Sequence, residues 1–242
     1  MHEIISIKNM RFDYGANKDP EGGLSIGRPH FTISIPEFHI SAGERVMLLG
    51  KSGSGKSTFL NLISGVLRAH EGSINLLGQD LTCLSAAQGD KCRGDHIGLI
   101  YQTLNLVPWL TAYENIALGV AFSQTRKLRI TGSIEEAAAY LMDCLGVPFD
   151  VFANARAESL SVGQQQRIGA ARALLGAPEL IIADEPTSAL DQANAEKFLD
   201  LVFDTMDDTS QSFLMVSHDE RLAARFSRVV QFEGLVLGGT PL

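Results

Sequence analysis

The sequence predicts an α/β fold in which a parallel sheet forms the core. Four short runs of uninterrupted apolar residues, at 46–49, 97–101, 180–183 and 213–216, are typical of strands buried on both faces. In residues 1–45 apolar and polar side chains alternate instead, which indicates antiparallel strands with one covered face. The segment between residues 105 and 173 has no such run and is expected to be mostly helical. Together these patterns predict an α/β core with an N-terminal antiparallel β part and a helical insert.

We expect a single domain over residues 1–242. Residues 1–45 form its antiparallel part, 46–104 and 174–242 its core, and 105–173 its helical insert. A Gly- and Pro-rich stretch from residue 14 to 28 predicts a loop between two strands. Two one-sided helices are expected from apolar residues at helical spacing. The first has Phe59, Leu60, Leu62, Ile63, Val66 and Leu67, and the second has Ala195, Phe198, Leu199, Val202 and Phe203.

Composition and charge exclude several classes of function. Apolar residues make up 45% of the 242 residues and charged residues 20%, as in a globular rather than a disordered protein. The net charge of -8 disfavours binding to nucleic acid or to anionic lipid, so a membrane role is expected only through a protein partner. We expect no signal peptide and no spanning helix, which needs roughly 18 apolar residues. The scattered Cys83, Cys92 and Cys144 are expected to be reduced thiols.

A phosphate-binding loop is the strongest chemical signal in the chain. The motif G-x-x-x-x-G-K-[ST] lies between a predicted buried strand and a predicted helix, which is where such a loop must lie. Its glycines let backbone N–H groups and the helix N-terminus face a phosphate. We expect Lys56 to reach the β- and γ-phosphates and the Ser57 hydroxyl to bind Mg²⁺. The loop comprises Gly50, Lys51, Ser52, Gly53, Ser54, Gly55, Lys56, Ser57 and Thr58.

Two carboxylates end the apolar strand predicted at 180–183. Asp184 is suited to hold Mg²⁺, through water, and Glu185 to polarise the attacking water. A positioned general base contributes about 10²–10⁴ in rate. A solvated strand end is the simpler interpretation of two such residues alone, but the phosphate loop makes the catalytic interpretation much stronger. The sequence therefore predicts a site that hydrolyses a nucleoside triphosphate.

Residues 160–167, between these two motifs, spell LSVGQQQR. This segment resembles the LSGGQ signature of the ATP-binding-cassette (ABC) ATPases, which opens a helix rich in Gln and Arg, and Ser161 could cap that helix as well. The family's other motifs follow in order over essentially the whole chain. The matches are Tyr14 (or Phe12) for the adenine-stacking aromatic, Gln102 for the Q-loop, Ser161, Val162, Gly163 and Gln164 for the signature, Asp191 for the D-loop and His218 for the switch histidine.

The resemblance implies ATP and Mg²⁺ as cofactors and a head-to-tail homodimer that encloses two ATP molecules. Each nucleotide would contact one subunit's phosphate loop and the other subunit's Ser161 and Gly163. The family's roles imply Glu185, His218 and Gln102 as catalytic residues and Ser57, Gln102 and Asp184 as metal ligands. Val162 replaces the usual first glycine, and its β-branched side chain adds bulk at this contact, but we expect activity to survive.

The resemblance also implies a transporter subunit at the cytoplasmic face of the inner membrane, attached through a permease. The apolar stretch 102–116 is expected to contact a short helix of that permease, although Trp109 and Leu110 fit the core of the insert equally well. The chain looks most like the lipoprotein-release and macrolide-exporter ATPases. Amino-acid importer ATPases are the nearest alternative. An ABC ATPase acting on nucleic acid and a phosphate-transferring kinase are weaker ones.

Overall fold

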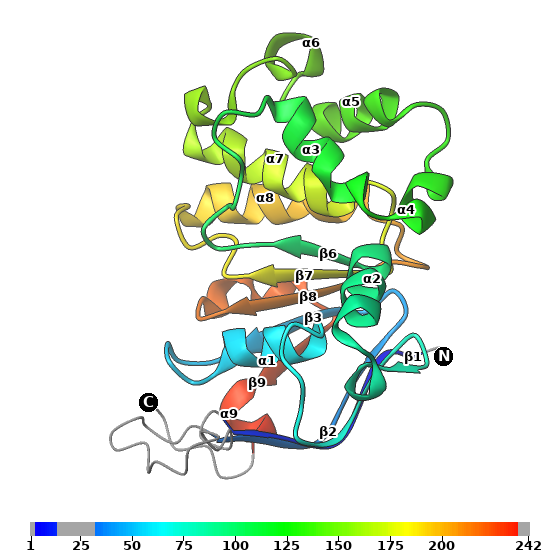
Figure 1. The fold of residues 1–242 in the computed structure, drawn as a ribbon. Coiled ribbons are helices and arrows are strands. Elements are labelled where there is room, and N and C mark those ends of the chain that lie inside the picture. The colour runs from blue at the N-terminus through cyan, green and yellow to red at the C-terminus, as the bar shows by residue number, and fades with distance from the viewer. Residues whose placement is uncertain (1–2, 14–31, 237–242) are drawn as a thin grey trace, which may run out of the picture.

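Two sheets and a layer of helices make up the part of the chain that the structure, a computed structural model, describes, namely residues 3–13 and 32–236 (Figure 1). The helices of the middle segment lie above the parallel sheet, and the antiparallel sheet lies below it. The strands are β1 (Glu3–Asp13), β2 (Thr32–Ser41), β3 (Arg45–Leu49), β4 (Glu71–Leu76), β5 (Gln79–Asp80), β6 (Ile97–Ile100), β7 (Leu180–Asp184), β8 (Ser212–Ser217) and β9 (Arg228–Gln231). The helices are α1 (Lys56–Ile63), α2 (Ala86–His96), α3 (Ala112–Ala121), α4 (Gln124–Arg129), α5 (Ile134–Cys144), α6 (Phe149–Phe152), α7 (Val162–Leu174), α8 (Gln192–Thr205) and α9 (Phe232–Leu235), with 3₁₀ turns η1 (Leu81–Cys83), η2 (Ala157–Ser159) and η3 (Glu220–Arg225).

The parallel sheet has the strand order β6-β7-β8-β3-β9. All four apolar runs expected to be buried strands are in it, as β3, β6, β7 and β8, which confirms the predicted α/β class. β9 is not among the strands predicted from the sequence. This strand lies at the edge of the sheet and alternates half-buried and exposed residues, so it has no uninterrupted apolar run.

The antiparallel sheet has the order β2-β1-β4-β5. β1 pairs with β2 in a register that places Phe12 opposite Ile33 and Ile7 opposite Phe38. β4 and β5 come from residues 71–80, which were expected in the core, yet β4 pairs with β1 and β5 pairs with β4. Residues 71–76 read EGSINL, whose alternation predicts a half-covered strand rather than a buried one.

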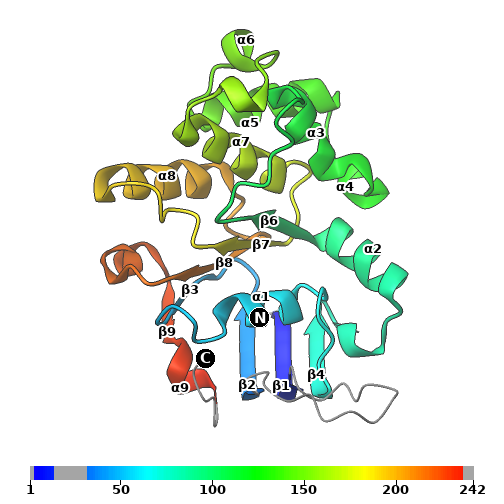
Figure 2. The ribbon, with the colours of Figure 1, turned by 60° about the vertical axis from the view of Figure 1, so that its left-hand side comes forward.

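Helix α1 lies between the two sheets (Figure 2). Because side chains alternate across a strand, the parallel sheet divides its apolar residues between two cores. On one face Val46, Leu48 and Ile182 pack with α1 and the antiparallel sheet. On the other face Met47, Ile181 and neighbouring residues pack with α3, α5, α7 and α8. The phosphate loop thus connects β3, which contributes to both cores, to α1, which belongs to one of them.

The two predicted amphipathic helices form as α1 and α8, but α1 is shorter than its apolar pattern. It ends at Ile63 and is followed by a turn with Gly65 at φ 71°, and Val66 is 55% exposed. α8 buries all five of its predicted apolar residues.

Trp109, in the helical segment, is 70% exposed. The interpretation that this residue belongs to the core of the insert is therefore wrong. Leu110 is half-buried. Among the described helices none has the length and hydrophobicity that crossing a bilayer requires.

A buried arginine fastens the end of α7 to the rest of the helical layer. Arg126 of α4 is 3% exposed, and its Nε donates to the Leu175 carbonyl at 2.9 Å while one terminal nitrogen donates to the Ala173 carbonyl at 2.7 Å. A cation at a helix C-terminus satisfies carbonyls that have no partner within the helix and opposes the negative end of the helix dipole. Burial lowers the pKa of Arg126 to about 10, so the group is charged at neutral pH. The helix that begins at the signature segment is therefore anchored at its opposite end.

Candidate functional site

The predicted phosphate loop lies between β3 and α1. Gly53 at φ 77° and Gly55 at φ 100° adopt left-handed conformations that other residues rarely accept, so the loop can curl back over the start of α1. Lys56 is 5% exposed, and its ammonium donates to the carbonyls of Gly50 at 2.8 Å and Lys51 at 2.7 Å. The loop is therefore folded around its own lysine.

The residues of this loop fit a phosphate group. The Ser54 hydroxyl oxygen is buried and has no hydrogen-bond partner among the described residues, which is costly unless a ligand supplies one. A Cβ added at Gly53 would meet nothing within 4 Å, so the loop has open space on that side. Backbone N–H groups at the start of α1 and the charge of Lys56 favour an anion. ATP bound here would supply the phosphoanhydride bond that is hydrolysed.

Ser57 and Asp184 meet beside the loop. Asp184 ends β7, and the Ser57 side chain lies near enough to its carboxylate to influence its pKa. Burial raises the pKa of Asp184 and the charge of Glu185 raises it further, while Ser57 and Lys56 act in the opposite direction. A hydroxyl and a carboxylate are the oxygen ligands that Mg²⁺ prefers. No group of three or more His, Cys, Asp or Glu side chains gathers within the described ranges, so phosphate oxygens and water would have to complete the shell.

Glu185 and His218 form a pair next to this position. Glu185 has φ 44°, in the left-handed region, and its N–H donates to the Val216 carbonyl of β8 at 3.0 Å. His218 follows β8 directly, and its Nδ1 lies 3.0 Å from Glu185 Oε2. Both line a small polar hollow of about 180 Å³ together with Thr187, Ser188 and other residues. The fold thus brings together a carboxylate and an imidazole that are 33 residues apart in the sequence.

Ser161 caps α7 at the start of the signature segment. Its hydroxyl accepts from the Gln164 N–H at 3.3 Å, and the Gln164 side chain accepts from the Ser161 N–H at 2.9 Å. Capping uses only an acceptor lone pair of the hydroxyl, so its O–H remains able to donate to a ligand. Val162 projects outward and is 56% exposed. The signature segment therefore presents a hydroxyl and an apolar side chain at the surface.

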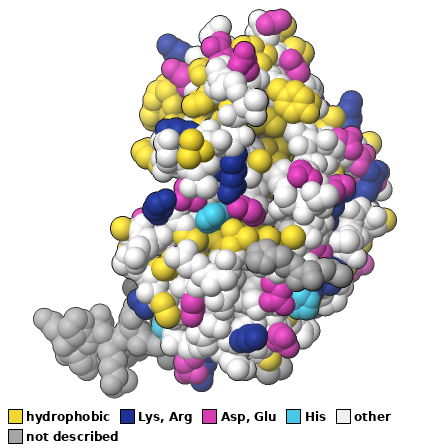
Figure 3. All heavy atoms as spheres, turned by 90° about the vertical axis from the view of Figure 1, so that its right-hand side faces the viewer, with side chains coloured by type: hydrophobic (Ala, Val, Ile, Leu, Met, Phe, Trp, Pro, Cys, Tyr) yellow, Lys and Arg dark blue, Asp and Glu magenta, His cyan; other side chains and the backbone are white. Residues whose placement is uncertain are grey.

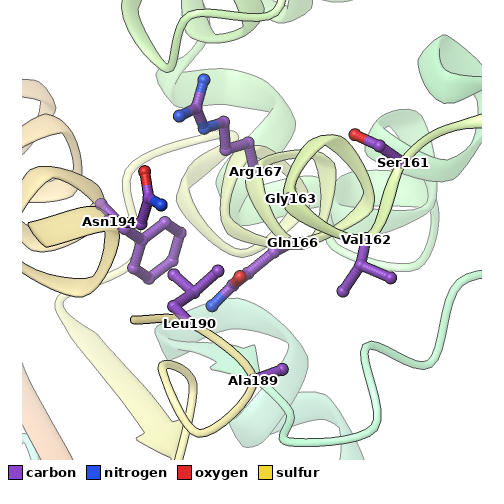
Figure 4. Close-up of a pocket in the computed structure, with 9 residues that line it drawn as sticks. Ser161, Val162, Gly163, Gln166, Arg167, Ala189, Leu190 and Asn194 are labelled. Atoms are coloured by element: carbon purple, nitrogen blue, oxygen red, sulfur yellow. The ribbon is translucent and has the colours of Figure 1, made fainter. Parts of the chain in front are cut away.

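A cavity of about 410 Å³ separates the signature segment from the predicted D-loop (Figure 4). Val162, Gly163 and Gln166 line it from α7, and Ala189 and Leu190 line it from the loop after β7. The side-chain amide of Gln166 donates to the Pro186 carbonyl and so ties the two segments together. Asp191, which ends this loop, accepts from the Asn194 N–H at 2.9 Å and caps α8.

Gln102 is exposed in the turn that follows β6. In the same turn, Leu104 and Asn105 have φ of 43° and 45°, which non-glycine residues adopt at a cost. Arg172 of α7 holds this turn by donating to the Asn105 carbonyl at 2.6 Å and to the Leu104 carbonyl at 3.0 Å. The Q-loop is thereby joined directly to the helix that starts at the signature.

Arg172 is not among the site residues predicted from the sequence, because no motif marks it. Both of its acceptors are backbone carbonyls, of residues in the left-handed conformation, and a bond to a backbone carbonyl does not require a particular residue type at that position. Tyr14, the predicted adenine-stacking residue, lies outside the described residues. Its alternative, Phe12, is 6% exposed in β1, and its ring stacks on His70 with centroids 5.1 Å apart.

The fold and these motifs define an ATP-hydrolysing cassette, and the chain belongs to the ABC transporter family. The family model described as "ABC transporter" matches residues 34–188. A lipoprotein-releasing system ATP-binding protein, LolD 2 of Rhodospirillum rubrum, is 38% identical over 205 residues, which cover 84% of this chain and 87% of the relative. LolD of Novosphingobium aromaticivorans is also 38% identical, over 97% of this chain and 98% of its own length.

Solved structures agree with this assignment. The dimeric structure of MJ0796, a bacterial ABC transporter cassette by its description, has a TM-score of 0.77 and 30% identity over 94% of this chain and 93% of that one. A post-hydrolysis dimer of the same cassette with ADP and Pi has a TM-score of 0.76 and 31% identity over the same shares. The predicted fold, family and ATPase activity are confirmed.

Proposed function

We propose that this chain powers a separate membrane permease of the lipoprotein-release or macrolide-export type, and that it does so as an ATP-bound homodimer. The observation that carries the proposal is the division of the site between two places on one subunit. The phosphate loop, Glu185 and His218 lie at one place, and the signature hydroxyl of Ser161 is exposed at another. A second copy, arranged head to tail, brings the two together. Solved dimers of a relative and similarity to LolD proteins over nearly the whole chain support it.

In this proposal the chain's own residues perform distinct tasks. Lys56 and the loop N–H groups bind the phosphates, with Tyr14 as the residue proposed to stack on adenine. Ser57, Asp184 and Gln102 would hold Mg²⁺, which neutralises phosphate charge. Glu185 polarises the attacking water, and His218, 3.0 Å away, holds that carboxylate in place.

The second subunit supplies the remaining contacts. Ser161, Val162, Gly163 and Gln164 would face the partner's nucleotide, and Asp191 would lie at the subunit boundary. The two capping hydrogen bonds hold Ser161 at the surface before a partner arrives, so less freedom is lost on association. ATP would thus join the two copies and hydrolysis would release them.

A groove of about 570 Å³ beside the Q-loop supports a permease contact. It lies between α2, α3, β6 and α7 and includes Tyr101, Leu118 and Phe122, the last of which is 94% exposed. Figure 3 shows this side of the molecule, with hydrophobic side chains gathered over the helical layer. Asn105 is the one residue of the expected 102–116 stretch among the described lining, so we propose that the contact lies next to that stretch rather than along it.

The charged rim of the groove favours a helix with a polar side as well. Asp90 and Arg93 line it from α2, and Arg172 lines it from α7. Because Arg172 also holds the Q-loop turn, a permease helix in this groove would contact the residue that connects the Q-loop to α7. We propose that the chain sits at the cytoplasmic face of the inner membrane through this contact, with no role for nucleic acid.

Co-purification tests the proposal. Tagged chain is isolated from detergent-solubilised membranes of its own source cells, as wild type, Phe122→Asp and Leu128→Asp. Leu128 is a matched control because it is 77% exposed on α4 and does not line the groove. We expect wild type and Leu128→Asp to retain a permease with a large extracytoplasmic domain, and Phe122→Asp to lose it while still binding ATP. Recovery of an amino-acid importer permease would contradict the proposed subgroup, and equal recovery by Phe122→Asp would contradict the docking groove.

A further inference from the structure

The short helix α9 contacts the beginning of the phosphate loop from outside the known motifs. It follows the edge strand β9 directly and starts at Phe232, which is fully buried. The Phe232 ring packs on Phe59 of α1 with centroids 5.7 Å apart, and Phe59 is itself fully buried. The next residue, Glu233, is therefore held by a rigid anchor that belongs to the same core as the helix after the loop.

The Glu233 carboxylate is bonded to the loop backbone. Its Oε1 accepts from the Lys51 N–H at 2.8 Å. A Cβ built on the neighbouring Gly50 would lie 3.1 Å from the Phe232 Cβ and 3.2 and 3.3 Å from the two Glu233 oxygens, so a side chain here would have to push Phe232 and Glu233 slightly away. The first two residues of the loop thus rest against Phe232 and Glu233.

This carboxylate is ionised. The Lys51 N–H hydrogen bond is the main influence that lowers the pKa of Glu233, and the charges of Lys56 and Lys51 lower it further. An anion near a phosphate site repels the ligand, so its charge alone would weaken binding. A charge-assisted hydrogen bond to a backbone N–H is, however, stronger and more directional than a neutral one. The benefit of Glu233 must then come from fixing the loop.

We propose that Glu233 is a positioning residue for nucleotide binding. By accepting the Lys51 N–H it sets the direction in which the loop leaves β3, so that the later N–H groups and the ammonium of Lys56 meet the phosphates without rearrangement. Lys56 bonds the Gly50 and Lys51 carbonyls from the inner side while Glu233 bonds the Lys51 N–H from the outer side. The same peptide segment is clamped from both directions.

Calorimetric titration of the purified chain with Mg-ADP tests this inference and requires neither a permease nor a dimer. Glu233→Ala is expected to raise the dissociation constant about fivefold or more, since a charge-assisted hydrogen bond is lost. Glu233→Gln keeps a carbonyl acceptor and is expected to stay within about twofold of wild type by the same reasoning. Glu37→Ala, which removes an exposed carboxylate from the neighbouring strand β2, is the matched control and should leave binding unchanged.

Steady-state kinetics separate positioning from general stability. We expect Glu233→Ala to raise KM for ATP while kcat stays close to wild type, with an unchanged thermal midpoint. Gly50→Ala should weaken Mg-ADP binding in the same way. The double variant should lose less binding free energy than the sum of the losses in the two single variants, because both substitutions disturb one contact. Wild-type affinity in Glu233→Ala, or an equal loss in Glu233→Gln, would overturn the inference. Fully additive effects of the two substitutions would overturn it as well.

Discussion

His218 Nδ1 lies 3.0 Å from Glu185 Oε2 at the carboxyl ends of two adjacent parallel strands. The pairing depends on an unusual backbone. Glu185 leaves β7 at φ 44°, and its N–H bonds back to β8, so its side chain turns toward the strand that carries the histidine. A residue held in such a conformation at a cost is a sign that its orientation matters to the chemistry.

Glu185→Gln should reduce steady-state ATP hydrolysis by about 10²-fold or more, because the amide is a poor base for the attacking water. Binding of ATP should persist, and the ATP-loaded variant should be a dimer by light scattering. The exposed Glu220→Gln of η3 provides a control with the same chemical change. Turnover near the wild-type rate would remove Glu185 from the role of base.

His218→Ala should lower kcat by about tenfold or more, because Glu185 loses the partner that orients it. ATP affinity should change much less, since the phosphate loop is untouched. Stopped-flow measurement of a single turnover, together with ATP titration, separates the two effects. A variant that loses affinity and keeps its hydrolysis rate would indicate that His218 acts in binding alone.

Lys56→Ala should weaken ATP binding about tenfold or more, because a charge-assisted contact to phosphate is lost and the Gly50 and Lys51 carbonyls lose their donor. Equilibrium titration with a fluorescent ATP analogue measures it. Lys51→Ala is the matched control: it removes a neighbouring exposed lysine and keeps the backbone N–H that bonds Glu233. Equal affinities in wild type and Lys56→Ala would contradict the assignment of the loop.

Ser161→Arg should allow ATP to bind one subunit and block ATP-driven dimerisation, because a long cation would occupy the surface that faces the partner's phosphate. Val162→Gly is the control at the next position, since it removes an exposed side chain and restores the usual signature residue. We expect it to dimerise. Sedimentation of both variants in the Glu185→Gln background measures the outcome, and a normal dimer of Ser161→Arg would refute the head-to-tail arrangement.

Asp184→Asn should stabilise the nucleotide-free chain at pH 7 and abolish Mg²⁺-dependent hydrolysis. Burial and the nearby Glu185 raise the pKa of Asp184 above 3.8, so the folded protein binds this proton more tightly than the unfolded chain. Its stabilising contribution is therefore present below 3.8 and is lost as pH rises through the raised value.

Thermal unfolding of wild type and Asp184→Asn, measured over a range of pH, tests the predicted direction of this pH dependence. The advantage of Asp184→Asn over wild type should be largest near neutral pH and should shrink as pH falls toward 3.8. Asp204→Asn, an exposed change on α8, should show no such trend. A variant less stable than wild type at pH 7 would show that the favourable effect of Ser57 and Lys56 on the charged carboxylate outweighs burial.

Sequence alone predicted the elements whose pattern is local. Buried strands such as β7 have a recognisable apolar run because both of their faces are covered. The phosphate loop has a recognisable glycine pattern because its positive φ values favour glycine. Where burial is partial the pattern weakens. The edge strand β9 and the strands β4 and β5 were therefore missed or assigned to the other sheet.

The class of protein followed from the residues alone, and so did the predictions of a nucleotide loop and of two carboxylates beside it, because such functions require particular residue types at fixed spacing. Three features became visible only in the folded chain: the contact of Arg172 with the Q-loop, the contact of Glu233 with the phosphate loop and the exposure of Trp109. Arg172 and Glu233 bond backbone atoms distant in the chain, and the exposure of Trp109 depends on how the helices pack. Every residue has a backbone carbonyl and every residue except proline has a backbone N–H, so such contacts leave no pattern in the sequence.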